Sequence, residues 1–151
     1  KIKYKLIEKL ILLDNDVKDG FLDSFNNNQN FFEEKTEKNI KGTLAFCLNY
    51  GGQQEIADAT AKIISEGYKA EEVTTQLIED HLYSPELGPV DLMIRTSGEQ
   101  RLSGFNLWRC SYAELIFSDK RWPAFSNEDL DSALEEFARR NRRFGGDAKV
   151  A

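Results

Sequence analysis

The amino-acid sequence predicts an α/β fold, in which a parallel β-sheet is covered by flanking helices. Strand-like and helix-like segments alternate along the chain, which is typical of parallel sheets. The chain has 151 residues, the size of one domain, so residues 1–151 are expected to form a single domain. Apolar residues make up 40% and aromatic residues 11%, which is enough for a hydrophobic core.

Two strands are expected in the amino-terminal part of the chain. Residues 1–7 alternate between lysine and apolar side chains, which is a strand pattern. Residues 43–49 are mostly apolar and predict a largely buried strand that ends at Gly51-Gly52. Between these strands, residues 14–20 are loop-like and residues 21–38 are expected to form a helix, although its asparagines are poor helix formers.

Two amphipathic helices are expected in the middle of the chain, over residues 55–66 and 70–82. The inward face of the first should consist of Ile56, Ala59, Ile63 and Ile64. The second should align Val73, Leu77 and His81 on one face. Proline and glycine at positions 85, 88 and 89 then indicate a loop.

The carboxyl-terminal part should contain two short strands, over residues 91–95 and 114–117, and one long helix. Ser126 is the expected N-cap of this helix, with Asp129 three residues further on. The residues expected to point inward are Leu130, Ala133, Leu134, Phe137 and Ala138. The basic end of the helix suits its dipole, and Gly145-Gly146 should stop it.

Composition narrows the possible functions. The net charge of −6 argues against broad nucleic-acid binding. No apolar run approaches the roughly 20 residues of a membrane-spanning helix. Cys47 and Cys110 are far apart, so two reduced thiols in a cytoplasmic protein are expected rather than a zinc site or a disulfide. His81, the only histidine, lies at helical spacing and favours a packing or surface role.

The segment from Arg95 to Glu114 is the strongest candidate for a functional site. Arg95 ends a predicted strand and is followed by a loop of small residues that contains Arg101 and Ser103. Two guanidinium groups, hydroxyl groups and flexible amides suit a phosphate or diphosphate ligand, although such a loop can also be merely structural. Glu114, at the head of the next strand, could hold Mg²⁺, and Glu99 could instead hold one of the arginines.

The motifs in and around this segment resemble those of the cis-prenyltransferases, the undecaprenyl diphosphate synthase family. The resemblance rests on Asp91–Ser103, Leu107-Trp108, Tyr112–Leu115, Trp122-Pro123, Arg142–Gly146, and, upstream, Leu48–Gly52 with Glu55-Ile56. It extends from about Thr36 to Gly146. It implies a transferase that condenses isopentenyl diphosphate onto an allylic prenyl diphosphate and so makes a cis-polyprenyl diphosphate, the precursor of a lipid carrier.

The resemblance also assigns roles to individual residues. Arg95, Arg101, Leu102 and Ser103 match the family's site for the isopentenyl diphosphate head group. Glu114 matches a carboxylate associated with Mg²⁺. Arg143 and Gly145 match a tail motif that reaches the partner's active site, which implies a homodimer. The family's lipid product implies peripheral contact of a cytoplasmic enzyme with a membrane.

Some family features are absent from the sequence. The Asp-Gly-Asn-x-Arg-Trp motif is missing, so the chain is expected to be the carboxyl-terminal half of a catalytic domain, to contain no catalytic residue of its own and to be inactive alone. Gly104 stands where the family usually has Asn, and Gln53 where Arg is common. The alternative is a non-catalytic partner subunit of such an enzyme. Since such subunits lose the substrate loop, Arg95, Arg101, Ser103 and Glu114 favour the enzyme.

Overall fold

The computed structural model describes residues 3–8, 37–38 and 43–140, which belong to two compact units, Lys1–Tyr50 and Gly51–Ala151. The expected loop over residues 14–20 and most of the expected helix over residues 21–38 lie outside this description. Glu37 and Lys38 form a turn. None of the described helices is long and apolar enough to cross a membrane.

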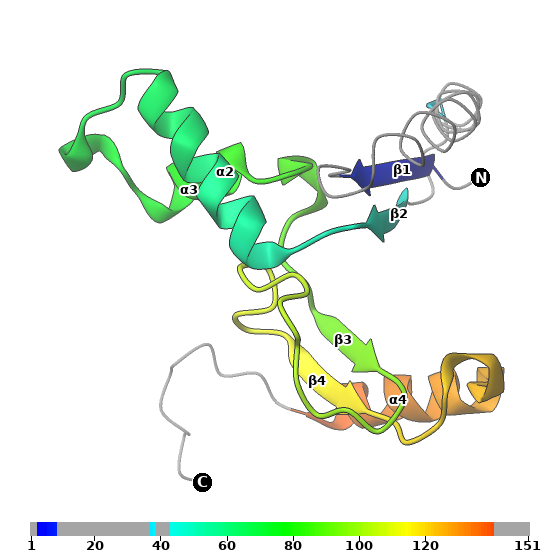
Figure 1. Cartoon of the computed structure of the whole chain (residues 1–151). Coiled ribbons are helices and arrows are strands. Elements are labelled where there is room, and N and C mark those ends of the chain that lie inside the picture. Colours follow the sequence, from blue (N-terminus) through cyan, green and yellow to red (C-terminus); the bar gives the residue numbers. More distant parts are fainter. Residues whose placement is uncertain (1–2, 9–36, 39–42, 141–151) are drawn as a thin grey trace, which may run out of the picture. The chain divides into compact units, whose positions relative to one another are not determined.

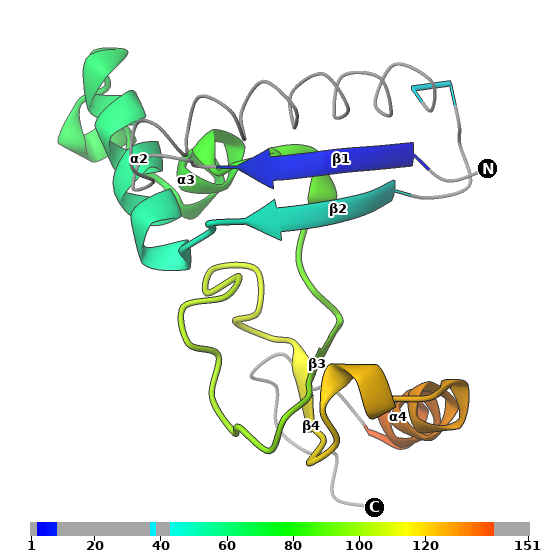
Figure 2. The same ribbon diagram turned by 45° about the vertical axis from the view of Figure 1, so that its right-hand side comes forward.

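The first unit contains a pair of parallel strands, β1 (Lys3–Glu8) and β2 (Thr43–Leu48), which lie side by side in Figures 1 and 2. The strand predicted from the alternating pattern is therefore confirmed. The prediction that β2 is mostly buried is wrong, because Leu44 is 41% exposed and Phe46 53% exposed. These two side chains share one face of the strand, and apolar composition cannot show whether that face is covered.

The second unit begins with the helix α2 (Gly52–Ser65), which starts three residues before the predicted position. Its buried face consists of Gly52, Glu55, Ala59 and Ile63. The predicted inward position of Ile64 is wrong, since 69% of this residue is exposed. One residue turns a helix by about 100°, so Ile64 cannot share the centre of the face that Ile63 occupies.

The single helix predicted over residues 70–82 is broken into two pieces, a 3₁₀ turn (Ala70–Glu72) and the helix α3 (Thr75–His81). Thr74 caps α3, because its side-chain oxygen accepts a hydrogen bond from the Leu77 amide at 3.1 Å. Val73 is extended, 44% exposed, and not aligned with Leu77 and His81 as predicted. A threonine that caps a new helix is a local reason for the break.

Two further parallel strands, β3 (Leu92–Arg95) and β4 (Glu114–Phe117), match the predicted strands closely. Leu92 is opposite Glu114 and Arg95 is opposite Phe117. A 3₁₀ turn (Pro85–Leu87) occupies the predicted loop before β3. The two parallel pairs and their helices agree with the predicted α/β class.

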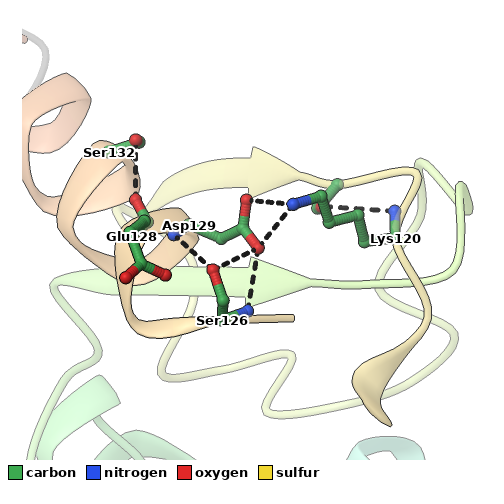
Figure 3. A network of polar contacts seen from close by, with 6 residues as sticks. Lys120, Ser126, Glu128, Asp129 and Ser132 are labelled. Carbon is green, nitrogen blue, oxygen red and sulfur yellow. Dashed lines mark hydrogen bonds and ion pairs between the residues drawn. The ribbon is translucent and has the colours of Figure 1, made fainter. Parts of the chain in front are cut away.

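The last described helix, α4 (Asn127–Arg139), begins at the predicted cap. The Asp129 amide donates to Ser126 Oγ at 3.4 Å, and the Asp129 carboxylate accepts from the Ser126 amide at 2.8 Å and from Lys120 Nζ at 2.7 Å (Figure 3). Ala133 is buried as predicted, but Leu130 and Leu134 are 41% and 46% exposed. Ala138 is also exposed, so the buried stripe is narrower than the apolar pattern suggested.

The predicted end of this helix is also wrong. α4 ends at Arg139, and Arg140 is its C-cap with an extended backbone. The helix therefore ends before Gly145-Gly146, which lie outside the described residues. An extended residue at the cap is enough to end a helix without a glycine.

His81 has the packing role that the sequence favoured. Its Nδ1 lies 2.7 Å from the Leu77 carbonyl oxygen and its Nε2 lies 2.9 Å from Glu66 Oε2. The Tyr68 ring meets it edge-on, with centroids 6.0 Å apart. Both ring nitrogens face hydrogen-bond acceptors, which favours the doubly protonated, charged ring. The pKa of His81 is therefore raised, mainly by the hydrogen bond to Glu66 and next by the one to the Leu77 carbonyl oxygen.

We therefore expect His81 to titrate above 6.5, its ordinary pKa, in an NMR titration of this single histidine. The stabilisation from its charged form should be complete below pH 6.5 and should be lost as the pH rises through the higher folded pKa. Glu66→Gln should lower the pKa of His81 and flatten the dependence of the melting temperature on pH in this range. A wild-type value at or below 6.5 would contradict the assignment.

Candidate functional site: a loop rich in arginine after strand β3

The loop that follows β3 is hydrogen-bonded to the segment that follows β4 in the chain. The Ser97 amide donates to the Lys120 carbonyl oxygen at 2.7 Å, and the Gly98 amide donates to that of Ser118 at 2.9 Å. Ser97 and Gly98 have positive φ angles of 77° and 75°, which turn the chain sharply after the strand. The loop therefore begins at the carboxyl end of β3, where parallel α/β sheets bind their ligands.

Arg95 connects the two ends of the predicted head-group motif. Its Nη1 donates to Ser103 Oγ at 2.9 Å and also to the carbonyl oxygen of Arg101. The structure thus brings the Arg95 side chain to Ser103 and to the Arg101 backbone, whereas the Arg101 side chain pairs with Glu99. Leu102 is half-buried, and its carbonyl oxygen accepts from the Phe105 amide at 3.0 Å, which closes a tight turn.

The Arg101 side chain forms an ion pair with Glu99, and their side chains are 63% and 41% exposed. Glu99 therefore holds Arg101, in agreement with the expectation that it could hold one of the two arginines. Such an exposed pair contributes little stability because water screens it. A more highly charged anion could replace the carboxylate at this guanidinium at small cost.

Gly52 brings the amino terminus of α2 directly against this loop. Its amide donates to the Gly104 carbonyl oxygen at 2.7 Å. A Cβ atom at position 52 would lie 2.5 Å from that oxygen and 3.1 Å from Leu107, so a side chain has no room there. The Gly51-Gly52 turn, which was predicted to end the preceding strand, therefore shapes the loop next to Ser103.

Glu114, the predicted magnesium ligand, forms an ion pair at the head of β4. Its Oε2 lies 3.0 Å from Arg140 Nη1, and the same nitrogen donates to the Leu115 carbonyl oxygen at 3.0 Å. Arg140 Nε also donates to Glu136 at 3.1 Å. In the described residues no three His, Cys, Asp or Glu side chains group together as metal ligands. Glu114 would therefore be the single carboxylate of such a site, and its role as a magnesium ligand stays a prediction.

The remaining predicted site residues, Arg143 and Gly145, lie outside the described residues. Sequence reasoning missed one charged pair, Glu55 and Arg109, which are 0% and 7% exposed. The signal that could have revealed it is the position of Glu55 on the helical stripe with Ala59 and Ile63, where an apolar residue is usual.

A parallel α/β unit with one arginine at the end of a strand and a second in the loop that follows defines an α/β protein suited to binding phosphate groups. Residues 16–145 match the family model of undecaprenyl diphosphate synthases. The chain therefore belongs to this family, the cis-prenyltransferases, and the predicted resemblance is confirmed.

Named relatives agree with this assignment. The chain is 48% identical over 117 residues to an isoprenyl transferase of Zymomonas mobilis, a match that covers 75% of this chain and 47% of the relative. It is also 48% identical over 117 residues to a decaprenyl diphosphate synthase of Mycobacterium tuberculosis, covering 75% of this chain and 40% of the relative. The matches thus span less than half the length of these two relatives.

Solved structures show the same fold. A probable undecaprenyl diphosphate synthase from Campylobacter jejuni superposes with a TM-score of 0.75 at 28% identity, covering 95% of this chain and 63% of that one. The lavandulyl diphosphate synthase of Lavandula x intermedia, solved with dimethylallyl diphosphate, gives 0.77 at 28% identity, covering 95% and 60%.

Alanine substitutions at Gly51 and Gly52 should show whether glycine is required for close packing against the loop or for backbone flexibility. Gly52→Ala should destabilise the protein by about 1–3 kcal/mol in urea unfolding, because the added methyl group meets a backbone oxygen. Gly51→Ala is the matched control, since its Cβ would lie 3.9 Å from the nearest atom and its φ is −141°. Equal losses from both substitutions would show that the close approach is not what requires glycine.

Proposed function

We propose that the protein containing this chain condenses isopentenyl diphosphate onto an allylic prenyl diphosphate and so makes a cis-polyprenyl diphosphate. The observation that carries the proposal is that Arg95, at the end of β3, contacts Ser103 and the Arg101 backbone in the loop that follows. Membership of the cis-prenyltransferase family gives this cluster its substrate class. The chain supplies the isopentenyl diphosphate head-group site, whereas the allylic substrate belongs to the Asp-Gly-Asn-x-Arg-Trp motif, which residues 1–151 lack.

The loop suits a diphosphate for electrostatic reasons. A guanidinium group can donate to two phosphate oxygens at once, and charge-assisted hydrogen bonds are about twice as strong as neutral ones. The Ser103 hydroxyl, now bonded to Arg95, adds a neutral donor beside the charges. In the reaction the allylic diphosphate ionises, the isopentenyl double bond attacks the resulting cation and a proton is lost. Fixed positive charge that stabilises the departing diphosphate would lower this barrier.

Glu114 is the proposed magnesium ligand of this chain. It would contribute one carboxylate oxygen while the other remains bonded to Arg140, and phosphate oxygens would complete the coordination. A bound Mg²⁺ ion would neutralise diphosphate charge and stabilise the leaving group. We further propose a homodimer in which Arg143 and Gly145 of one subunit reach the partner's site, with peripheral membrane contact through the lipid product.

The alternative is a non-catalytic subunit that supports a separate synthase. The two proposals differ in one assay, in which purified full-length protein is incubated with labelled isopentenyl diphosphate, an allylic diphosphate and Mg²⁺. Chain elongation supports the enzyme, whereas elongation only after a second subunit is added supports the alternative. The chain of residues 1–151 by itself should not elongate, because the Asp-Gly-Asn-x-Arg-Trp motif is absent from its sequence.

In the full-length protein, Arg101→Ala should weaken the binding of isopentenyl diphosphate more than the binding of the allylic substrate. A charge-assisted hydrogen bond contributes about 1.5–3 kcal/mol, so the KM for isopentenyl diphosphate should rise roughly 10- to 150-fold. Arg101→Lys should restore only part of this loss, because a point charge cannot reproduce the fork. Arg121→Ala, an exposed arginine outside the loop, is the control. An unchanged KM in Arg101→Ala would remove Arg101 from the site.

Glu114→Gln should raise the Mg²⁺ concentration needed for half-maximal turnover and should also lower turnover. Arg140→Gln removes the same ion pair but keeps the carboxylate, so it serves as the matched control. Melting curves of the two variants should be similar, and a magnesium titration should separate them. If both variants melt earlier and both keep the wild-type Mg²⁺ requirement, Glu114 is only a structural partner of Arg140.

A further inference from the structure

The most deeply buried charges in the described part of the molecule belong to Glu55 and Arg109, whose side chains are 1% and 6% exposed. Arg109 Nη1 donates to Glu55 Oε1 at 2.7 Å. The two residues are 54 positions apart in sequence, one in the first turn of α2 and the other in the loop between β3 and β4. Neither has a place in the chemistry proposed above.

The pair is part of a network that leaves few polar groups without partners. Arg109 Nη2 donates to the carbonyl oxygens of Tyr83 and Ser84, the latter at 3.3 Å. The Tyr83 amide donates to Glu55 Oε1 at 3.1 Å. Burial, and the Asp58 carboxylate to which the Tyr83 hydroxyl donates, raise the pKa of Tyr83. The network therefore has a buried ion pair at its centre and joins three separate segments of the second unit.

The network anchors the substrate loop next to its head-group motif. Gly104 is held to Gly52 at the start of α2, and Arg109 is held to Glu55 one turn further along the same helix. Between these anchors, Trp108 Nε1 donates to Glu79 at 3.1 Å. Ser103 precedes the first anchor directly, so its position and that of the Arg95 contact depend on where α2 holds the loop.

Stability alone does not account for a buried ion pair. The desolvation of two charges often cancels their attraction, and well-packed apolar residues can replace such a pair without loss of stability. A directional network with several fixed acceptors does, however, define one position of the loop relative to the helix. This is a property that an apolar contact between the same positions would lack.

We propose that Glu55 and Arg109 are positioning residues for the diphosphate loop. They hold the loop against α2 so that Arg95, Arg101 and Ser103 form the head-group site, and they do not touch the substrate themselves. The proposal rests on the proposed function of the loop. It predicts a defect specific to isopentenyl diphosphate, since the allylic substrate is bound elsewhere.

The test uses the full-length protein with the double substitution Glu55→Leu/Arg109→Met, which removes both charges and keeps similar volumes. We expect its melting temperature to stay near that of the wild type while the KM for isopentenyl diphosphate rises by on the order of 10-fold or more. The KM for the allylic substrate should not change. Lys62→Met, at an exposed position on the same helix, is the control and should leave both values unchanged.

A second readout reports the loop without turnover. In the full-length protein the Trp108 emission is obtained as the signal that Trp108→Phe removes, and this emission should shift in the double variant if the loop moves. Wild-type emission together with a wild-type KM for isopentenyl diphosphate would overturn the proposal, as would equal rises in both KM values. If the wild-type protein shows no transferase activity, the proposed function fails, whereas unchanged Trp108 emission would count separately against the positioning role.

Should the double variant fail to fold, Arg109→Lys replaces it. Lysine keeps the charge beside Glu55 but cannot serve Glu55 and the Tyr83 and Ser84 carbonyl oxygens in the same planar arrangement. This variant should fold and show a smaller rise in the KM for isopentenyl diphosphate together with a shift in Trp108 emission. A folded Arg109→Lys protein with wild-type values of both would overturn the proposal.

Discussion

In the second unit the position of the loop that carries the candidate site depends on the buried contact between Glu55 and Arg109, because this contact joins the loop to α2. Removing one partner of a buried pair strands the other charge and typically costs about 3–5 kcal/mol. A shift of the loop relative to α2 would separate the two buried charges, so the contact fixes the loop at one position on the helix. Gly52 adds a steric condition at the same place, since only a residue without a side chain lets the loop backbone come this close.

This constraint explains how a loop with several residues at positive φ can keep one conformation. Ser103, Gly104 and Asn106 all have φ angles between 46° and 82°. For Ser103 and Asn106, which carry side chains, a positive φ costs free energy unless the surroundings fix the backbone. The anchors at Gly104 and Arg109 supply that fixation after the head-group motif, and the hydrogen bonds from Ser97 and Gly98 supply it before the motif. Arg101 lies between these two sets of contacts, and Arg95, at the end of β3, contacts its backbone.

Local signals allowed much of this to be predicted from sequence. The Ser126 cap was predicted correctly because it depends on two residues only three positions apart. The strands β3 and β4 were predicted correctly because each is a short apolar run. The arginines were chosen as candidates because guanidinium and hydroxyl groups in a small-residue loop after a strand suit a phosphate, and their roles stay predictions. Burial was predicted less well, as Phe46 and Ile64 show, since exposure depends on what covers a residue. The Glu55–Arg109 pair was missed because periodicity counts only apolar residues and does not link positions 54 apart.

The central claim, that the loop after β3 binds the diphosphate of isopentenyl diphosphate, can be tested by one NMR titration of the full-length protein with this ligand. Amide and arginine Nε signals should be followed as the ligand is added. The claim predicts saturable shifts concentrated at Arg95, Arg101 and Ser103, with Arg121 and Arg139 unaffected. Saturable binding that leaves the loop signals in place, or shifts confined to other surfaces, would contradict it.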